Sequence, residues 1–385
     1  MFKISTIQAA KRSLIQFLII LSAVAFYSCS TTDDLQIDNS VDFEAFLNEE
    51  MDYQKIPALS ILVFQNDQVR YERNLGKSHI DQNIDLESSH LFLLASVSKV
   101  ITATALLQLY EQGRFQLDDP INNYLPFQVS IPNQSQSITF KMLLTHTSGI
   151  ADGPSMDGQY YYDQDSPVGL GYFLEQYLVP GGEFYDAQGN FHTFAPGSKS
   201  EYSNIGNALI GHLVEQISGS DFNNYCKEHI FNPMGMNNSY WRLDEVNQTI
   251  VQPYKYESGR YQALRHYTFT DYPNGGLRST ATDLFQFFSA FVQDGLSNGN
   301  RLLKAETIRQ MLTLQIPNID SETGLHLFLM NQQHNLWGHD GGEEGVATMV
   351  AFEPELGTGV IILTNQGDAD LDQILVEAYK MAGKL

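Results

Sequence analysis

The chain has 385 residues, of which 43% are hydrophobic and 17% charged, a composition typical of globular rather than disordered proteins. A chain of this length favours two lobes or one elaborate domain. Acidic residues outnumber Lys and Arg by 45 to 22, and this negative charge argues against nucleic acid as a partner, because it repels a phosphate backbone.

The N-terminal segment is predicted to direct export. Basic residues precede an apolar run over residues 14–26, which has the length of a signal-peptide core and is too short to span a bilayer. Ser28 and Cys29 follow this run and resemble a bacterial lipobox, whose cysteine becomes the lipidated first residue. We therefore expect residues 1–28 to be a lipoprotein signal peptide and Cys29 to anchor the protein to a membrane of the bacterial cell envelope, on the periplasmic side or at the surface. A plain secretory peptide with an incidental cysteine is the alternative.

The composition after the signal peptide predicts a flexible tether over residues 29–45 and one folded domain over residues 46–385. Apolar runs bounded by turn residues predict strands near both ends of that domain, over residues 58–64, 69–75, 345–352 and 357–363. Helical spacing of apolar residues follows over residues 371–382. This layout predicts an α/β (α+β) fold, in which both chain ends build one antiparallel sheet flanked by helices. A helical and loop insertion, the helical lobe, is expected over roughly residues 120–260.

The middle of the chain is predicted to hold helices and loops. Residues 98–112 are almost wholly apolar and end before Gly113, which predicts a helix buried on all sides. Residues 204–217 and 283–292 are further expected helices, and the Gly-, Tyr-, Asp- and Pro-rich residues 151–200 are expected to be a long loop region.

Ser96-Val97-Ser98-Lys99 is the single Ser-x-x-Lys in the chain. Residues three apart on a helix share a face, so a serine at the start of the buried helix has Lys99 beside it. Burial of an ammonium lowers its pKa, which makes the neutral amine available as a base for Ser96. The N–H groups of the helix N-terminus add positive potential where an oxyanion forms. The pair predicts a nucleophilic serine activated by lysine rather than by histidine, and the alternative is an ordinary N-cap serine with a snorkelling lysine.

A second motif, Tyr202-Ser203-Asn204, opens the helix predicted from residue 204. The tyrosine is placed to relay a proton between the nucleophile and the leaving group, and the Asn204 amide to hold Lys99 and the substrate. Tyr272-Pro273-Asn274 is a second Tyr-x-Asn, but it sits in a Pro-Asn-Gly-Gly turn where no helix is expected to begin, which favours Tyr202.

The third motif is His339-Asp340-Gly341-Gly342, just before the strand expected over residues 345–352. Glycines at a sheet edge leave backbone N–H groups accessible to a ligand. His339, Asp340, Gly341 and Gly342 are therefore expected to form the oxyanion-binding and substrate-binding side of the site.

In this order, the three motifs resemble those of the serine β-lactamase and penicillin-binding-protein superfamily, especially its class C β-lactamase and esterase branch. The resemblance spans roughly residues 55–365 and implies a β-lactamase/transpeptidase-like fold, an active site between sheet and helical lobe, and no cofactor. By that resemblance Ser96 is the acylated residue, and Lys99 and Tyr202 share the general-base and general-acid roles. The N–H groups of Ser96 and Gly342 then form the oxyanion hole.

One departure from the family pattern bears on the substrate. Members that act on penicillins or D-Ala-D-Ala peptides place a cation and a hydroxyl at the third motif, whereas this chain has His339 and Asp340. An ionised Asp340 facing the site repels a substrate carboxylate, so neutral or cationic esters and amides are expected to be preferred over β-lactams. The alternative is that Asp340 turns away to cap a local N–H.

These features predict an exported serine hydrolase that acts on a small-molecule or peptide substrate through an acyl-enzyme. A D,D-carboxypeptidase or β-lactamase is one alternative, and an inactive binding or sensor protein with the same fold is another. His146, in Thr-His-Thr-Ser-Gly, is expected to belong to a hydrogen-bonded turn rather than to act as a base. No metal site is expected, because His334 and His339 lack further ligands at suitable spacing.

Overall fold

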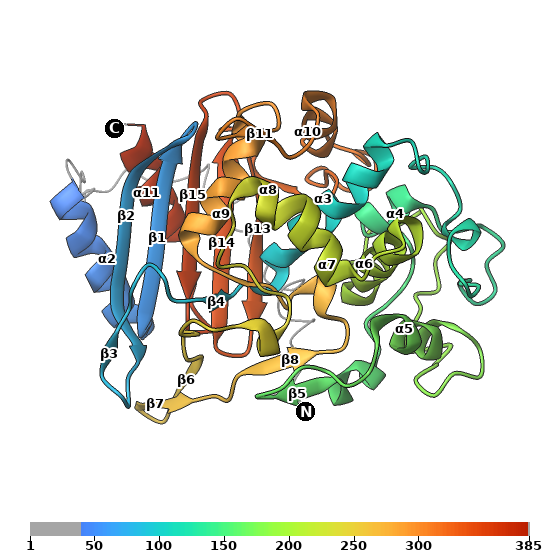
Figure 1. Cartoon of the computed structure of the whole chain (residues 1–385), viewed down its shortest axis with the longest axis horizontal. Helices are drawn as coiled ribbons and strands as arrows, with labels where there is room; N and C mark the ends of the chain where they lie inside the picture. The colour runs from blue at the N-terminus through green and yellow to red at the C-terminus, as the bar shows by residue number, and fades with distance from the viewer. Residues whose placement is uncertain (1–39, 384–385) are drawn as a thin grey trace, which may run out of the picture. The chain divides into compact units, whose positions relative to one another are not determined.

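Both ends of the described chain, residues 40–383 of the computed structural model, contribute to one seven-stranded antiparallel sheet (Figure 1). Its strands, in spatial order, are β12 Phe328–Asn331, β13 Leu336–Glu343, β14 Val346–Glu353, β15 Thr358–Thr364, β1 Ala58–Gln65, β2 Gln68–His79 and β3 Ile84–Asp85. Strands β1 and β15 are paired, with Ile61 opposite Ile362. The prediction of one antiparallel sheet made from both chain ends is therefore confirmed.

Helices cover both faces of this sheet, and every β1 residue except the last is buried. Helix α9 (Ala281–Phe288) packs on β1 and β15, where the Phe285 ring lies 5.4 Å from that of Phe64. Helix α11 (Asp372–Ala382) packs on the same two strands and contacts α2 (Ser40–Gln54) beside it (Figure 1). Continuous apolar strands of this kind are typical of sheets covered on both sides.

The start of the folded domain differs from the prediction. The sequence predicts a tether up to residue 45, but residues 40–45 form the first turns of α2. Phe43 and Leu47 are fully buried on this helix, and the Phe43 ring packs edge-on against Tyr71 of β2 at 5.3 Å. Apolar residues spaced four apart give the helix a buried face. The polar composition of the residues around them does not reveal this face.

Helices and short strand pairs fill the chain between β3 and β12. The helices are α3 Ser98–Glu111, α4 Phe140–Leu144, α5 Leu170–Leu178, α6 Asn204–Ser218, α7 Phe222–Cys226, α8 Asn232–Met234, α9 Ala281–Phe288 and α10 Ala305–Met311. The paired short strands are β4 Phe92–Leu93 with β9 Arg278–Ser279, β5 Tyr160–Tyr162 with β8 Tyr267–Phe269, β6 Tyr254–Glu257 with β7 Arg260–Ala263, and β10 Leu296–Ser297 with β11 Asn300–Arg301. Residues 151–200 are thus not one long loop, because α5 buries Phe173 and Leu174 in the core.

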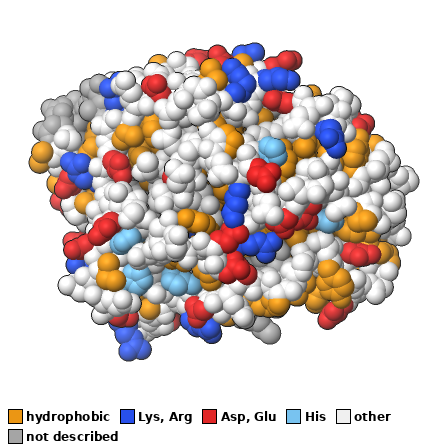
Figure 2. All heavy atoms as spheres, viewed as in Figure 1, with side chains coloured by type: hydrophobic (Ala, Val, Ile, Leu, Met, Phe, Trp, Pro, Cys, Tyr) orange, Lys and Arg blue, Asp and Glu red, His pale blue; other side chains and the backbone are white. Residues whose placement is uncertain are grey.

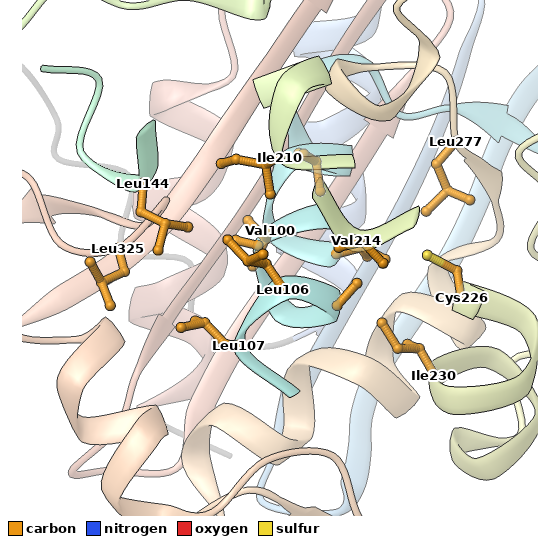
Figure 3. Close-up of a cluster of buried hydrophobic side chains, with 14 of the residues drawn as sticks. Val100, Leu106, Leu107, Leu144, Ile210, Val214, Cys226, Ile230, Leu277 and Leu325 are labelled. Atoms are coloured by element: carbon orange, nitrogen blue, oxygen red, sulfur yellow. The ribbon is translucent and has the colours of Figure 1, made fainter. Parts of the chain in front are cut away.

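Helix α3 lies at the centre of the helical part, as its apolar sequence predicts. Every residue from Ser98 to Leu107 is buried, and α3 packs against α6. Figure 3 shows Val100 and Leu106 of α3 next to Ile210 and Val214 of α6. Fixing α3 and α6 against each other also fixes the residues at their N-terminal ends, where the sequence places Ser96 and Tyr202.

The described surface carries mixed charge. On the face shown in Figure 2, Lys and Arg side chains lie scattered among Asp and Glu. No helix within residues 40–383 combines the length and the apolar character needed to cross a bilayer.

Candidate active site

Ser96 lies in a single 3-10 turn, Ala95–Val97, that leads directly into α3. Ala95 adopts a left-handed φ of 48°, which is uncommon for a residue with a side chain and marks a sharp entry into the helix. Ser96 remains partly accessible to solvent, whereas Ser98 and Lys99 are completely buried. The structure therefore presents the serine at the surface of the site and places the lysine behind it.

The Lys99 amine has three oxygen neighbours. Its Nζ lies 3.1 Å from Ser96 Oγ, 2.7 Å from Asn204 Oδ1 and 2.7 Å from the main-chain oxygen of Asn274. The two shorter contacts go to carbonyl oxygens, which accept hydrogen bonds and have no hydrogen to donate. A neutral amine has two N–H hydrogens and one lone pair, so its hydrogens satisfy the two carbonyls and its lone pair faces the Ser96 hydroxyl.

The charge state of Lys99 follows from its burial. Loss of hydration lowers its pKa to about 7, although Asp152, Asp271, Glu343 and Asp340 all act to raise it. Burial is the larger effect because the amine is completely removed from solvent. A substantial fraction of Lys99 is then neutral near pH 7, which is what a general base requires.

Asp152 orients Asn204 and caps α6. Its carboxylate accepts hydrogen bonds from the Asn204 main-chain N–H at 2.9 Å, the Asn204 side-chain Nδ2 at 3.0 Å and the Ile205 N–H at 3.1 Å. Because Nδ2 is committed to Asp152, the Asn204 Oδ1 is turned toward Lys99. Burial raises the pKa of Asp152, and the two main-chain N–H groups oppose that shift.

Asn274 enters the site through its backbone. The sequence favours Tyr202-Ser203-Asn204 over Tyr272-Pro273-Asn274 as the catalytic motif. The main-chain carbonyl of Asn274 nevertheless accepts a hydrogen bond from Lys99. The side chain of Asn274 is held in turn by Asp271, whose Oδ2 accepts from its Nδ2 at 2.6 Å. Burial raises the pKa of Asp271 to about 7. As the sequence predicts, this segment is a turn and no α-helix begins there: Tyr272–Asn274 forms one isolated 3-10 turn.

Tyr202 lies beside the same amine. Lys99 Nζ is 4.9 Å from the centre of the Tyr202 ring, which is 38% exposed. The ring stacks on His146 at 4.4 Å and lies 6.4 Å from the ring of His339. The structure thus brings Ser96, Lys99, Tyr202 and Asn204 together, although they come from two separate segments of the chain.

The third motif runs along β13. His339 is buried, and its Nδ1 donates to the main-chain oxygen of Asp340 at 2.6 Å. The Asp340 side chain is 41% exposed, and its Oδ1 lies 4.0 Å from His339 Nδ1. His334, considered with His339 as a metal pair, instead packs on Tyr379. Among residues 40–383, no group of three or more His, Cys, Asp or Glu side chains is arranged to hold a metal ion.

Gly341 of β13 lies against the turn that carries Ser96. A Cβ added to Gly341 would lie 2.5 Å from the Leu94 main-chain oxygen and 2.9 Å from the Ser96 main-chain nitrogen. Thr348, opposite Gly341 on β14, donates to the same Leu94 oxygen at 2.7 Å. Glycine is therefore required at 341 for β13 to pass this close to Ser96, and Gly342 is the next residue along that edge.

Glu343 ends β13 with a further carboxylate. Tyr160 of β5 donates its hydroxyl to both Glu343 carboxylate oxygens, at 3.2 and 3.3 Å. Burial raises the pKa of Glu343, and Lys99 opposes that shift. Sequence spacing does not identify Asp152, Asp271 or the role of Tyr160, since each reaches the site from a different loop or strand.

Cys29, the predicted lipidation site, and the predicted signal peptide lie outside the described residues.

Comparison with known proteins places this arrangement in a family. The chain matches the family described as Beta-lactamase over residues 43–379. It is 26% identical over 341 residues to penicillin-binding protein 4* of Bacillus subtilis, covering 83% of this chain and 70% of that protein. Among solved structures it is similar to a penicillin-binding protein of Bacillus halodurans (25% identity, TM-score 0.70, 86% and 98% of the two chains). It also shares the fold of EstCE1, titled a hydrolase with promiscuous acyltransferase activity (17% identity, TM-score 0.71, 88% and 97%). The chain belongs to the Beta-lactamase family and has its β-lactamase/transpeptidase-like fold.

Proposed function

We propose that the protein is a serine hydrolase that forms an acyl-enzyme at Ser96 on an ester or amide substrate, with Lys99 as general base. The observation that carries this proposal is the hydrogen bonding of the Lys99 amine. Two carbonyl oxygens at 2.7 Å use its two N–H hydrogens, and Ser96 Oγ at 3.1 Å occupies the remaining direction. The lysine is thus arranged to remove the serine proton.

The proposed reaction has two halves. Ser96 Oγ attacks the substrate carbonyl while its proton passes to Lys99 Nζ, and a tetrahedral oxyanion forms. The carbon–leaving-group bond then breaks, and the leaving group takes a proton delivered by Lys99 and Tyr202. A water molecule attacks the resulting ester, gives up its proton to the same pair, and releases the acid and the free serine.

Oxyanion stabilisation is assigned to the main-chain N–H groups of Ser96 and Gly342. The proximity of Gly341 to Ser96 nitrogen supports this proposal, because β12 pairs with β13 only up to Gly338 and the stretch of β13 beyond it lies against the turn of Ser96. Donors fixed before the reaction stabilise the developing charge without reorganisation.

The charges around the site favour substrates without a carboxylate. Asp152, Asp271, Asp340 and Glu343 all lie close enough to Lys99 to influence its pKa. A substrate carboxylate entering this region finds His339 in place of the cation of related enzymes and Asp340 in place of the hydroxyl, and an ionised Asp340 repels it. Neutral or cationic esters and amides are therefore the proposed substrates.

A D,D-carboxypeptidase or β-lactamase is the second candidate. The similarity to penicillin-binding protein 4* supports it, since that relative covers most of the chain. The acidic third motif argues against it.

A substrate panel tests the proposed function. Purified protein and a Ser96→Ala variant are assayed in parallel with a p-nitrophenyl ester, nitrocefin and a D-Ala-D-Ala peptide. We expect Ser96-dependent hydrolysis of the ester and slow turnover of the other two. Efficient hydrolysis of nitrocefin or the peptide would support the second candidate, and the absence of Ser96-dependent turnover or labelling by a fluorophosphonate would indicate an inactive binding protein.

Export and lipid anchoring at Cys29 are proposed from the sequence of the N-terminal segment. Expression in a bacterial host with globomycin, which blocks lipoprotein signal peptidase, is expected to accumulate the precursor. A Cys29→Ala variant that is still processed and retained in the membrane fraction would contradict the proposal.

A further inference from the structure

His146 makes three contacts with Tyr202 and its two neighbours in the chain. Its main-chain oxygen accepts from the N–H of Glu201 at 2.8 Å, and its Nδ1 accepts from the N–H of Ser203 at 3.2 Å. Its ring stacks on the Tyr202 ring at 4.4 Å, with 28° between the planes. One residue therefore fixes the backbone on both sides of Tyr202 and also the plane of its side chain.

The backbone of His146 is shaped for this role. It adopts a left-handed φ of 55°, directly after α4, and its side chain is 3% exposed. A left-handed residue with a large side chain is uncommon and is retained only where its surroundings hold it in place. Such a conformation turns both the carbonyl and the imidazole of one residue toward the same neighbouring segment, 201–203.

The hydrogen bond to Ser203 also fixes the tautomer of His146. A main-chain N–H can only donate, so Nδ1 carries the lone pair and the proton of the neutral ring is on Nε2. Protonation of the ring would place a hydrogen on Nδ1 and remove this contact. The bond to Ser203 therefore requires the neutral form of His146.

Two further rings pack against the ring of His146. The ring of His326, which is 1% exposed, lies 4.7 Å away and edge-on, and the ring of Phe328 lies 6.3 Å away. Burial lowers the pKa of His326 well below its usual value, and His146, His339 and Lys99 lower it further.

We propose that His146 is a positioning residue for Tyr202. It holds the phenol beside Lys99 through the two backbone contacts and the stacked ring, and it takes no proton from Ser96 itself. This inference rests on the proposed function, in which Tyr202 helps to transfer protons. The sequence identifies His146 as part of a turn, and the structure adds that the turn supports the active-site tyrosine.

A double-mutant cycle tests this role. The rate of Ser96 labelling by a fluorophosphonate is measured for His146→Ala, Tyr202→Phe and the double variant, together with kcat and KM on a p-nitrophenyl ester. His146→Asn, which keeps an acceptor for the Ser203 N–H, serves as the rescue variant. His212→Asn is the matched control, because His212 is also buried and stacked on an aromatic ring, Phe127, away from Ser96.

We expect His146→Ala to lower the labelling rate and kcat by about 10- to 100-fold, because a small misplacement of a catalytic group has effects of this size. KM is expected to change by less than about twofold, and His146→Asn to recover part of the loss. In the Tyr202→Phe background the His146 substitution is expected to change the rate by less than about twofold. The His212 control is expected to alter stability and not kcat.

An equal loss from His146→Ala in both backgrounds would overturn the proposal, and so would a rate within about twofold of the wild type. If the Ala variant does not fold, His146→Phe, which keeps a ring without an acceptor, takes its place in the cycle. Labelling of the wild type that does not depend on Ser96 would instead overturn the proposed function. The two failures are therefore distinguishable.

Discussion

The Lys99 amine donates a 2.7 Å hydrogen bond to the main-chain oxygen of Asn274. Asn274 belongs to the second Tyr-x-Asn motif, which the sequence disfavours as a catalytic motif relative to Tyr202-Ser203-Asn204. A second carbonyl, Asn204 Oδ1, accepts from the same amine at 2.7 Å. With both hydrogens used in this way, the only remaining position at the nitrogen faces Ser96. In the neutral form of Lys99, two carbonyl oxygens thus direct the lone pair toward the serine.

The pH dependence of acylation is expected to follow Lys99. Below its pKa of about 7 the lysine is an ammonium, whose third hydrogen occupies the position of the lone pair. The neutral fraction increases as the pH rises, so kcat/KM for a neutral ester should increase through an acid limb near pH 7 and then level off. Stopped-flow measurement of acylation between about pH 5 and 9 checks this. An acid limb that lies wholly below pH 5 would show that the ammonium form is competent, contrary to the proposed role.

Asp152→Asn is expected to weaken both stability and activity. The new amide group faces N–H donors that then have no acceptor, and this loss lowers the free energy of unfolding by about 1–3 kcal/mol. The substitution also releases Asn204 from its orientation toward Lys99. Chemical denaturation and kcat measure the two effects. Asp165→Asn is the matched control, because Asp165 also accepts from two main-chain N–H groups, those of Leu243 and Asp244. A loss of kcat in the control equal to that of Asp152→Asn would contradict the account.

Gly341→Ala is expected to reduce kcat by about 100-fold, because the added Cβ forces β13 away from the Ser96 turn. The contacts of 2.5 Å and 2.9 Å to Leu94 oxygen and Ser96 nitrogen involve backbone atoms that cannot rotate away. Gly169→Ala is the control, since nothing lies within 4 Å of a Cβ added there. Wild-type kcat in Gly341→Ala, with an unchanged melting temperature, would show that β13 does not need this close approach.

Asp340→Asn is expected to shift selectivity toward carboxylate-bearing substrates. Removal of one charge a few ångströms from a bound carboxylate is worth on the order of 1 kcal/mol, so kcat/KM for nitrocefin should rise about fivefold. The value for an uncharged p-nitrophenyl ester should change by less than about twofold. Asp67→Asn, in the turn between β1 and β2, provides a control for the general effect of lost charge. Equal changes for both substrates would indicate that Asp340 does not face the bound acyl group.

Patterns along the sequence predict the sheet and the buried helix because both depend on local periodicity. The apolar runs that become β1, β14 and β15 are bounded by turn residues. Helix α3 is mostly apolar and is buried at every position from Ser98 to Leu107. Each can be recognised within a window of about 15 residues. The Ser-x-x-Lys pair is equally local, since helical spacing alone places Lys99 next to Ser96.

Contacts between distant segments were not predictable in this way. Asp152 accepts from Asn204 and the Asn274 carbonyl accepts from Lys99; the two residues lie before and after α6, and no spacing rule relates them to Ser96. His146 shows the same limit, because its turn is visible in the sequence while its stacking on Tyr202 is not. The residues that tune the site therefore become visible only once the fold places them together.

The most direct test of the central claim is mass spectrometry of the protein after rapid quenching of its reaction with a p-nitrophenyl ester. We expect one added acyl group on the peptide that contains Ser96, absent from Ser96→Ala and formed at least about 1,000-fold more slowly in Lys99→Met. An acyl group on another residue, or hydrolysis by Ser96→Ala at the wild-type rate, would contradict it.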